Sequence, residues 1–377
     1  MTEALQEIDA RGLSAGRFRD EIELTARPLV LRGLLADWPA VRAGRDGPQA
    51  LVAYLRRFDR GIPVKAKRAP PEALGRFFYN EDLTGYNFRK ETMSVSAALD
   101  ILLASAQEPT PGALAIQSIQ ARHVLPGFDL ENVMPVLPDS AAPRLWIGNA
   151  VTVAAHYDPA DNIACVAAGR RRFTLFPPEQ VANLYPGPFE LTIAGPIVSM
   201  VDFDAPDANL YPGFAEAMKV ALVADLEPGD AIYIPCMWWH HVRSSEPMNM
   251  LVNYWWDAPN SAHGPGIDAL LHAMMAIKGL PEPHRAAWRA LFSHYVFQDG
   301  DAPGLHLPTD RRGVQGDLTP EAARALQEAL ARALGGAQAP NGLKQQARAL
   351  LATVRNRARM LLRFGGPAGP GSQNVER

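Results

Sequence analysis

The middle of the chain, from about Ala113 to Trp256, consists of short runs of apolar and β-branched residues separated by glycine, proline, asparagine and aspartate. Such runs indicate a β-sandwich or β-barrel, because each strand must reverse direction after a few residues. The runs that we interpret as strands are Arg144–Ile147, Ala164–Ala167, Arg172–Phe176, Ala231–Pro235 and Met248–Trp255. The centre of the protein is therefore expected to be a β-barrel.

Both flanks are predicted to be more helical than the centre. Before it, we expect a helical, amphipathic opening segment to about Ala26, strands at Leu29–Leu31 and Ile62–Lys67, and helices at Gln49–Phe58 and Ser94–Ala106. Either Ser94 or Ser96 can cap the last of these helices. After Pro259, apolar residues recur at helical spacing in Ile267–Lys278, Pro283–Phe297, Pro320–Leu334 and Leu343–Phe364.

These changes of pattern predict four regions. Residues 1–112 supply helical and strand elements that pack on the core, and residues 113–258 form the barrel. Residues 259–364 form a C-terminal helical region, and residues 365–377, rich in glycine, proline and polar side chains, form a disordered tail. The predicted fold class is mainly β, with N-terminal α/β elements and C-terminal helices around a barrel core.

Composition argues against several other classes of protein. The 47% hydrophobic and 20% charged residues are ordinary for a globular protein, and a net charge of −3 gives no general attraction to nucleic acid or anionic membranes. Two cysteines, Cys165 and Cys236, are too few for a disulfide framework and suit a reducing compartment. The N-terminus lacks the apolar core of a signal peptide, so we expect a cytoplasmic protein.

The residues that suggest chemistry begin in AAHYDPADN, residues 154–162. His156 and Asp158 are two residues apart, and on a strand such side chains point to the same face. A second motif, GDAIYIPCMWWHHV at residues 229–242, places His240 and His241 after a turn and a strand. Two histidines and one carboxylate form the facial triad of non-haem iron(II) oxygenases. Zinc and manganese accept the same ligands, so these residues alone leave the metal open.

Each motif also has an ordinary structural interpretation. A His-x-Asp tripeptide is frequent by chance, and a single histidine near a strand is more often structural than a ligand. The occurrence of both motifs, each between a turn and a strand, favours a metal site that forms when barrel strands bring them together. The histidines without ligand spacing are interpreted as structural: His123, His263, His272, His284, His294 and His306.

A longer stretch, HYDPADNIACVAAGRRRFTLFPPEQVANLYPGP at residues 156–188, strongly resembles the Jumonji-like cupin oxygenases. This family includes the asparaginyl hydroxylase of hypoxia-inducible factor and many bacterial cupin-like proteins. GDAIYIPCMWWHHVRS (229–244) and LVNYWW (251–256) resemble its second half, and RPLVLRGLLADWPA (27–40) resembles its N-terminal signature. The resemblance implies a double-stranded β-helix (cupin or jelly-roll) core. It also implies that the distal ligand is the first histidine after the paired tryptophans, His240, with His241 on the opposite face.

The resemblance further implies how 2-oxoglutarate would be held. Family members bind its distal carboxylate with a basic side chain, often lysine, and the matching residue here is Arg171. A guanidinium can hold a carboxylate through two hydrogen bonds. By strand alternation, either Arg171 or the pair Arg170 and Arg172 faces inward.

Other positions of the family pocket are matched less completely. Asn162 and Asn253 match asparagines that line it. Thr152 matches a hydroxyl residue that helps to hold 2-oxoglutarate, in a loop one residue shorter here. No residue among Leu114–Gln117 matches a tyrosine that binds the co-substrate.

The activity implied by the resemblance is hydroxylation of a protein or peptide side chain, or of a small molecule. Fe(II) would be the metal, held by His156, Asp158 and His240, with 2-oxoglutarate and O₂ as co-substrates and succinate as co-product. A cupin metalloenzyme that does not use 2-oxoglutarate is one alternative, favoured by the arginine and the missing tyrosine. A non-catalytic cupin-fold binding protein is another. Succinate formation and metal content separate the three.

Some expectations concern packing and assembly. The four tryptophans Trp238, Trp239, Trp255 and Trp256 are interpreted as core and pocket wall, Tyr157 as pointing away from the metal, and Cys165 as buried. Leu343–Phe364 carries an apolar stripe that could pack on the barrel. Because related hydroxylases dimerise through C-terminal helices, we expect a homodimer through this region.

Overall fold

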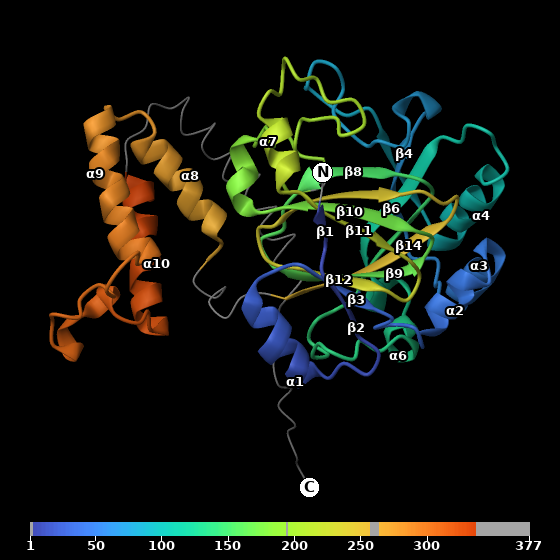
Figure 1. Cartoon of the computed structure of the whole chain (residues 1–377), viewed down its shortest axis with the longest axis horizontal. Helices are drawn as coiled ribbons and strands as arrows, with labels where there is room; N and C mark the ends of the chain where they lie inside the picture. Colours follow the sequence, from blue (N-terminus) through green and yellow to red (C-terminus); the bar gives the residue numbers. More distant parts are fainter. Residues whose placement is uncertain (1–2, 194, 257–263, 337–377) are drawn as a thin grey trace, which may run out of the picture. The chain divides into compact units, whose positions relative to one another are not determined.

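The computed structural model describes residues 3–193, 195–256 and 264–336. The chain divides into a β-rich unit that ends at residue 257 and a helical unit that follows it. Within the described residues, the β-rich unit contains a five-stranded and a nine-stranded sheet, which form two layers in Figure 1. The prediction of a mainly β, jelly-roll fold with flanking helices is confirmed.

The two sheets are built from strands that are distant in the sequence. The smaller sheet has the order β1 (Glu3–Ala4), β11 (Leu222–Leu226), β10 (Arg171–Phe176), β13 (Trp239–Ser244) and β8 (Thr152–His156). The larger sheet has the order β2 (Glu7–Asp9), β3 (Leu29–Arg32), β12 (Ala231–Ile234), β9 (Asp161–Ala168), β14 (Asn249–Trp256), β7 (Arg144–Gly148), β6 (Ala113–Gln120), β4 (Val64–Ala69) and β5 (Arg89–Met93).

Side chains from both sheets meet in one apolar cluster inside the barrel. Phe173 of β10 and Val242 of β13 pack there with Val166 of β9, Ile232 of β12 and Leu251 of β14. The central strands β9, β12 and β14 are buried along most of their length. Strands buried on both faces consist of nearly continuous apolar residues, which explains why their sequences are recognisable as strands.

Three helices cover the outer face of the larger sheet, as Figure 1 shows. They are α2 (Pro39–Arg45), α3 (Pro48–Arg56) and α4 (Val95–Ser105). Their buried side chains join a second core with those of β6, β7 and β14. Ser94 is the N-cap of α4 and accepts a hydrogen bond from the Ala97 amide, whereas Ser96 binds the Asp59 carboxylate.

The prediction of a helical opening segment is wrong for residues 3–9. β1 pairs in parallel with β11, where Glu3 lies opposite Leu222, and β2 pairs in parallel with β3. Helical turns begin only at α1 (Ala15–Arg17) and continue as irregular turns to Thr25. Pairing with strands far along the chain overrides the local preference of this segment, because propensity is only a weak determinant of structure.

Within residues 113–256, four strands lie outside the predicted runs: β6, β8, β11 and β13. In the N-terminal region, β1, β2 and β5 lie outside them as well. β8 is rich in small residues and β13 in polar ones, with the sequences TVAAH and WHHVRS. Neither has the regular alternation that identifies a half-buried strand. These two strands nevertheless carry both histidines of the predicted metal site.

The helical unit contains the predicted helices as α8 (Gly266–Ile277), α9 (Glu282–Phe292) and α10 (Pro320–Gly336). Thr319 caps α10 by accepting a hydrogen bond from the Ala322 amide (3.2 Å). Large apolar side chains of this unit are exposed, among them Trp288, Leu291 and Phe297. The predicted helix at residues 343–364, with the dimer interface assigned to it, and the tail at 365–377 lie outside the described residues.

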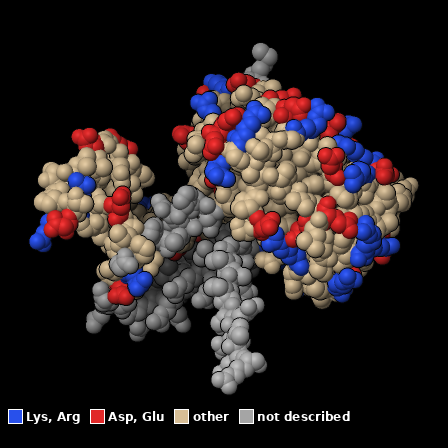
Figure 2. All heavy atoms as spheres, turned by 90° about the horizontal axis from the view of Figure 1, so that it is seen from below, with Lys and Arg blue, Asp and Glu red and all other residues tan. Residues whose placement is uncertain are grey.

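On the face that Figure 2 shows, basic and acidic side chains of the β-rich unit are intermixed, without a large area of one sign. Among the helices that the structure describes, none combines the length and the apolar character needed to cross a bilayer.

Candidate metal centre

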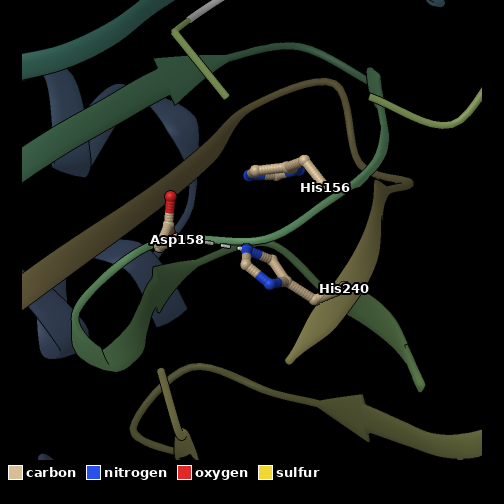
Figure 3. Close-up of side chains that lie close together, drawn as sticks. All are labelled: His156, Asp158 and His240. Atoms are coloured by element: carbon tan, nitrogen blue, oxygen red, sulfur yellow. Dashed lines mark ion pairs between the residues drawn. The ribbon is translucent and has the colours of Figure 1, made fainter. Parts of the chain in front are cut away.

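His156 and His240 come together because their strands are neighbours in the smaller sheet. β8 pairs with β13 in antiparallel orientation, with His156 opposite His240. The centroids of the two imidazole rings are 4.2 Å apart, and Figure 3 shows both side chains turned toward the same space as Asp158. The register of one strand pair therefore places two of the three predicted ligands.

Asp158 reaches the same space from a loop rather than from a strand. β8 ends at His156, so the expectation that the two residues share the face of one strand is incorrect. The Met237 amide donates a hydrogen bond to the Asp158 carbonyl (2.9 Å) and holds this loop beside the turn before β13. The Asp158 carboxylate lies 3.6 Å from His240 Nε2, and one ligand atom from each of the three residues lies within 4.8 Å of the others.

Hydrogen bonds at the far side of each ring select the nitrogen that faces this space. His156 Nδ1 lies 2.9 Å from the Ala154 carbonyl, and His240 Nδ1 lies 3.1 Å from the Trp238 carbonyl. A carbonyl only accepts, so each Nδ1 carries the proton and each Nε2 keeps a free lone pair. Burial, with the neighbouring His156, lowers the pKa of His240 to about 4, which keeps its ring in the neutral form that binds metals.

The Asp158 carboxylate is oriented by neutral donors on the larger sheet. Trp255 Nε1 donates a hydrogen bond to Asp158 Oδ2 (3.2 Å), and Asn162 Nδ2 lies 3.5 Å from the same oxygen. The Asn162 amide oxygen in turn accepts a hydrogen bond from Asn253 Nδ2 (2.7 Å). Both asparagines are buried. The sequence predicted Asn162 and Asn253 as co-substrate residues; the structure connects them to the Asp158 carboxylate, and their contact with a co-substrate stays a prediction.

The three side chains fit a divalent transition metal. They offer two neutral imidazole nitrogens and one carboxylate, a set typical of iron(II) sites that leaves positions open for other ligands. Only 5% of the His240 side chain and 12% of the Asp158 side chain are exposed. In the part of the chain that the structure describes, this is the group of histidine, cysteine and acidic residues with metal-binding geometry.

Arg171 faces the barrel interior, whereas its two neighbours face solvent. It is 6% exposed, while Arg172 pairs with Asp225 at the surface and Arg170 lies near Glu227. Within the described part of the chain its Nε has no hydrogen-bond partner, and burial lowers the pKa of Arg171 to about 10. Of the two alternatives left by strand alternation, the structure supports Arg171.

A second donor without a partner lies beside Arg171, and the sequence analysis missed it. Trp146 Nε1 is buried, and no residue that the structure describes supplies an acceptor for it. Trp146, Arg171 and Gln117 line one cavity, with Gln117 in the segment where the family tyrosine had no match. Trp146 stands at an inward position of the predicted strand Arg144–Ile147. The alternation of side chains along a strand could therefore have indicated that it faces the barrel interior.

Other candidate residues lie elsewhere. Thr152 is buried but is not among the residues that line the cavity, where Val151 and Val153 are found instead. His241 stacks on Phe203, with ring centroids 4.4 Å apart, and is not part of the metal-ligand group. Tyr157 packs edge-on against the buried Trp239.

Residues 15–262 match the sequence model of the cupin-like domain. The Jumonji C domain-containing protein 5 of Drosophila melanogaster is 36% identical over 67% of this chain and 60% of its own length. The human bifunctional peptidase and (3S)-lysyl hydroxylase JMJD7 is 28% identical over 61% of this chain and 77% of its own. The tRNA wybutosine-synthesizing protein 5 of Gallus gallus is 30% identical over 75% of this chain and 91% of its own. The chain therefore belongs to the cupin-like domain family.

Proposed function

We propose that this protein is an Fe(II)- and 2-oxoglutarate-dependent oxygenase that hydroxylates a protein or peptide side chain. His156, Asp158 and His240 would hold the metal through two Nε2 atoms and one carboxylate oxygen. Arg171 and Trp146 would hold the distal carboxylate of 2-oxoglutarate. Bound together, Fe(II) and 2-oxoglutarate supply the activation of O₂ and its coupling to decarboxylation of the co-substrate to succinate.

The observation that carries this proposal is the pair of donors at one cavity. Arg171 Nε and Trp146 Nε1 are both buried, both without acceptors, and both line the same cavity. Each unpaired buried donor costs about 1–3 kcal/mol. An anion in the cavity would satisfy both, and a carboxylate offers two oxygens for two donors.

The strand register would let one short dicarboxylate join Arg171 to the metal site. In the pairing of β10 with β13, Leu175 lies opposite His240 and Arg171 lies opposite Ser244. Four residues of a strand correspond to roughly 13 Å. An extended arginine side chain and a five-carbon dicarboxylate together can span this distance, so one end of the ligand reaches the metal while the other meets Arg171.

The chain's own residues prepare the metal site for this chemistry. The carbonyls of Ala154 and Trp238 keep the Nε2 atoms of the two histidines unprotonated, and Trp255 fixes the Asp158 oxygen by a hydrogen bond. Outer partners of this kind orient the ligands and tune their affinity for the metal. Burial of His240 and Asp158 limits the access of water to the reacting atoms.

A protein or peptide side chain is the first substrate class to test. One relative is named a lysyl hydroxylase and another a tRNA-modifying protein, so both polypeptide and RNA are candidates. A net charge of −3 and the intermixed surface charges favour a polypeptide, because RNA binding generally requires a basic surface.

Succinate formation tests the proposal. Purified protein would be incubated with Fe(II), ascorbate and 2-oxoglutarate, with and without a peptide library, and with His156→Ala as the control. We expect succinate from the wild type alone and peptide products heavier by one oxygen atom. Metal binding without succinate would favour a cupin metalloenzyme that does not use 2-oxoglutarate, and absence of metal binding would favour a non-catalytic binding protein.

A further inference from the structure

A short two-stranded ribbon extends the smaller sheet beside His156. Its arms are residues 185–187 and 198–200: the Gly187 amide donates to the Val198 carbonyl (2.8 Å), and the Met200 amide donates to the Tyr185 carbonyl (2.9 Å). The ribbon continues the edge of β8, because Val198 bridges to His156 and the Ser199 amide donates to the Ala155 carbonyl (2.7 Å). The backbone of His156 thus lies against this ribbon.

Between the arms, three consecutive carbonyls are bound by side chains from a distant part of the chain. Tyr79 Oη donates to the Leu191 carbonyl (2.8 Å), and Tyr86 Oη donates to the Thr192 carbonyl (2.7 Å). Lys67 Nζ of β4 donates to the Ile193 carbonyl (3.2 Å). Thr192 and Ile193 are themselves buried. Three side-chain donors on three successive residues form a clamp on this segment.

Lys67 differs from the two tyrosines because it is a buried cation. It is 9% exposed, and Nζ lies 5.0 Å from the ring centroid of Phe88 and 5.9 Å from that of Phe77. β5 places Lys90 opposite it in the strand register. Burial, with the charge of Lys90, lowers the pKa of Lys67 to about 7.

We propose that Tyr79, Tyr86 and Lys67 clamp the ribbon against the barrel and thereby position His156, and that loss of a proton from Lys67 tightens the clamp. All three act as positioning residues, since their hydrogen bonds go to the Leu191–Ile193 segment and none of them belongs to the metal-ligand group. The consequence for His156 rests on the proposed function, while the clamp itself does not. The ribbon wall of the site would then be firmest in weakly alkaline solution.

The direction of the pH effect follows from linkage. When the Leu191–Ile193 segment is released, water reaches Lys67 and its pKa returns toward the ordinary lysine value. Between about pH 7 and that value, the released state binds a proton that the clamped state does not, so clamping becomes more favourable as pH rises. Below about pH 7 both states are protonated and clamping no longer depends on this group. Lys90 is the charged group that acts on Lys67, and the titratable side chains of Tyr79 and Tyr86 lie on the adjoining carbonyls of the same segment.

Hydrogen exchange followed by mass spectrometry tests the clamp on the full chain. Protection factors, corrected for intrinsic exchange, would be compared between pH 6 and pH 9 for peptides covering 185–193 and 198–200, with α4 as the internal reference. In the wild type we expect protection to rise by up to about tenfold per pH unit above about pH 7. In Lys67→Met, which fills the same apolar space without a titratable group, we expect no such rise. A flat wild-type profile, or an equal rise in Lys67→Met, would overturn the proton-controlled clamp.

The link to His156 is tested by metal affinity at constant pH. Tyr79→Phe and Tyr86→Phe each remove one hydroxyl from the clamp, and we expect weaker Mn(II) binding by up to about tenfold. Tyr54→Phe is the matched control, because it also removes one tyrosine hydroxyl. That hydroxyl contacts Glu131 and Asn132, in the core beneath α2, α3 and α4 and away from the clamp. Unchanged affinity in both clamp variants would refute the positioning role. A wild type that binds no metal would instead refute the proposed function, and the exchange experiment would still decide the clamp.

Discussion

Replacement of Arg171 by methionine is expected to stabilise the protein in the absence of ligand. Arg171 is 6% exposed, and its Nε has no hydrogen-bond partner among the described residues. Burial depresses the pKa of Arg171 to about 10, and the difference from the ordinary arginine value corresponds to about 3 kcal/mol of burial penalty. Because the folded-state pKa lies below the unfolded-state value, this penalty is fully present at pH 7, begins to fall above about pH 10 and is lost only as the pH passes the ordinary arginine pKa.

The expected gain for Arg171→Met is about 1–3 kcal/mol in the free energy of unfolding, since apolar residues that replace buried ions often stabilise by this amount. Urea unfolding at pH 7 measures it. The matched control is Arg172→Met. This change removes the exposed ion pair between Arg172 and Asp225, which is expected to contribute less than about 1 kcal/mol to the free energy of unfolding.

Binding of Mn(II) and 2-oxoglutarate should make the wild type more stable than Arg171→Met. With Mn(II) present and 2-oxoglutarate at about 100 times its Kd, the wild type should gain about 2.7 kcal/mol, whereas Arg171→Met should gain almost nothing. A ligand-free Arg171→Met protein that is less stable than the wild type would show that Arg171 has a structural role. An equal gain from 2-oxoglutarate in both proteins would refute its assignment to the co-substrate.

Four further outcomes are expected. His156→Ala and Asp158→Ala should each lose stoichiometric Mn(II) binding in calorimetry while their circular dichroism stays that of the wild type; full metal content in both would exclude the triad. Arg171→Ala should raise the Kd of 2-oxoglutarate much more than Arg170→Ala, and the opposite result would invert the strand facing. Trp255→Phe removes the donor to Asp158 and should weaken metal binding about 10–100-fold; Trp256→Phe, which loses only a bond to Glu23, should not, and equal affinities would leave Trp255 a packing role. Light scattering should find the intact chain dimeric, as expected from the apolar stripe in the sequence of residues 343–364, and a chain ending near Gln315 monomeric; a monomeric intact chain would remove the dimer.

The barrel could be predicted because its central strands carry their structure in local sequence. β9, β12 and β14 are buried on both faces and consist of apolar runs between turns. The two histidine motifs were recognisable for a similar reason, since each follows or precedes a turn. A strand or motif could therefore be predicted wherever the residues of one short segment alone determine its conformation.

Pairing between distant segments left no such signal. Glu3 pairs with Leu222, but nothing in the sequence around either residue predicts this pairing. The local pattern of residues 3–9 therefore predicts a helix, where the structure has strands. Asp158 shows the same difficulty at the metal site. The two-residue spacing predicts that its side chain faces the same space as His156, but the position of the carboxylate depends on a loop that the distant Met237 amide holds by a hydrogen bond. The three side chains do lie together as the sequence predicts, but Asp158 lies on a loop and not on the strand that carries His156.

Trp146 is harder to predict, because its polar atom has no partner within the described chain. When two residues form a hydrogen bond, both polar side chains are present in the sequence. When a donor binds a ligand, its acceptor is not part of the chain, so the sequence contains only one of the two groups. In a strand, a single tryptophan is ordinarily a core residue. Only the structure shows that its indole nitrogen and Arg171 Nε line one cavity without acceptors. A cupin that bound a metal alone would gain nothing from two such donors and would bear about 1–3 kcal/mol for each. Their presence therefore favours an anionic co-substrate over the metal-only alternative.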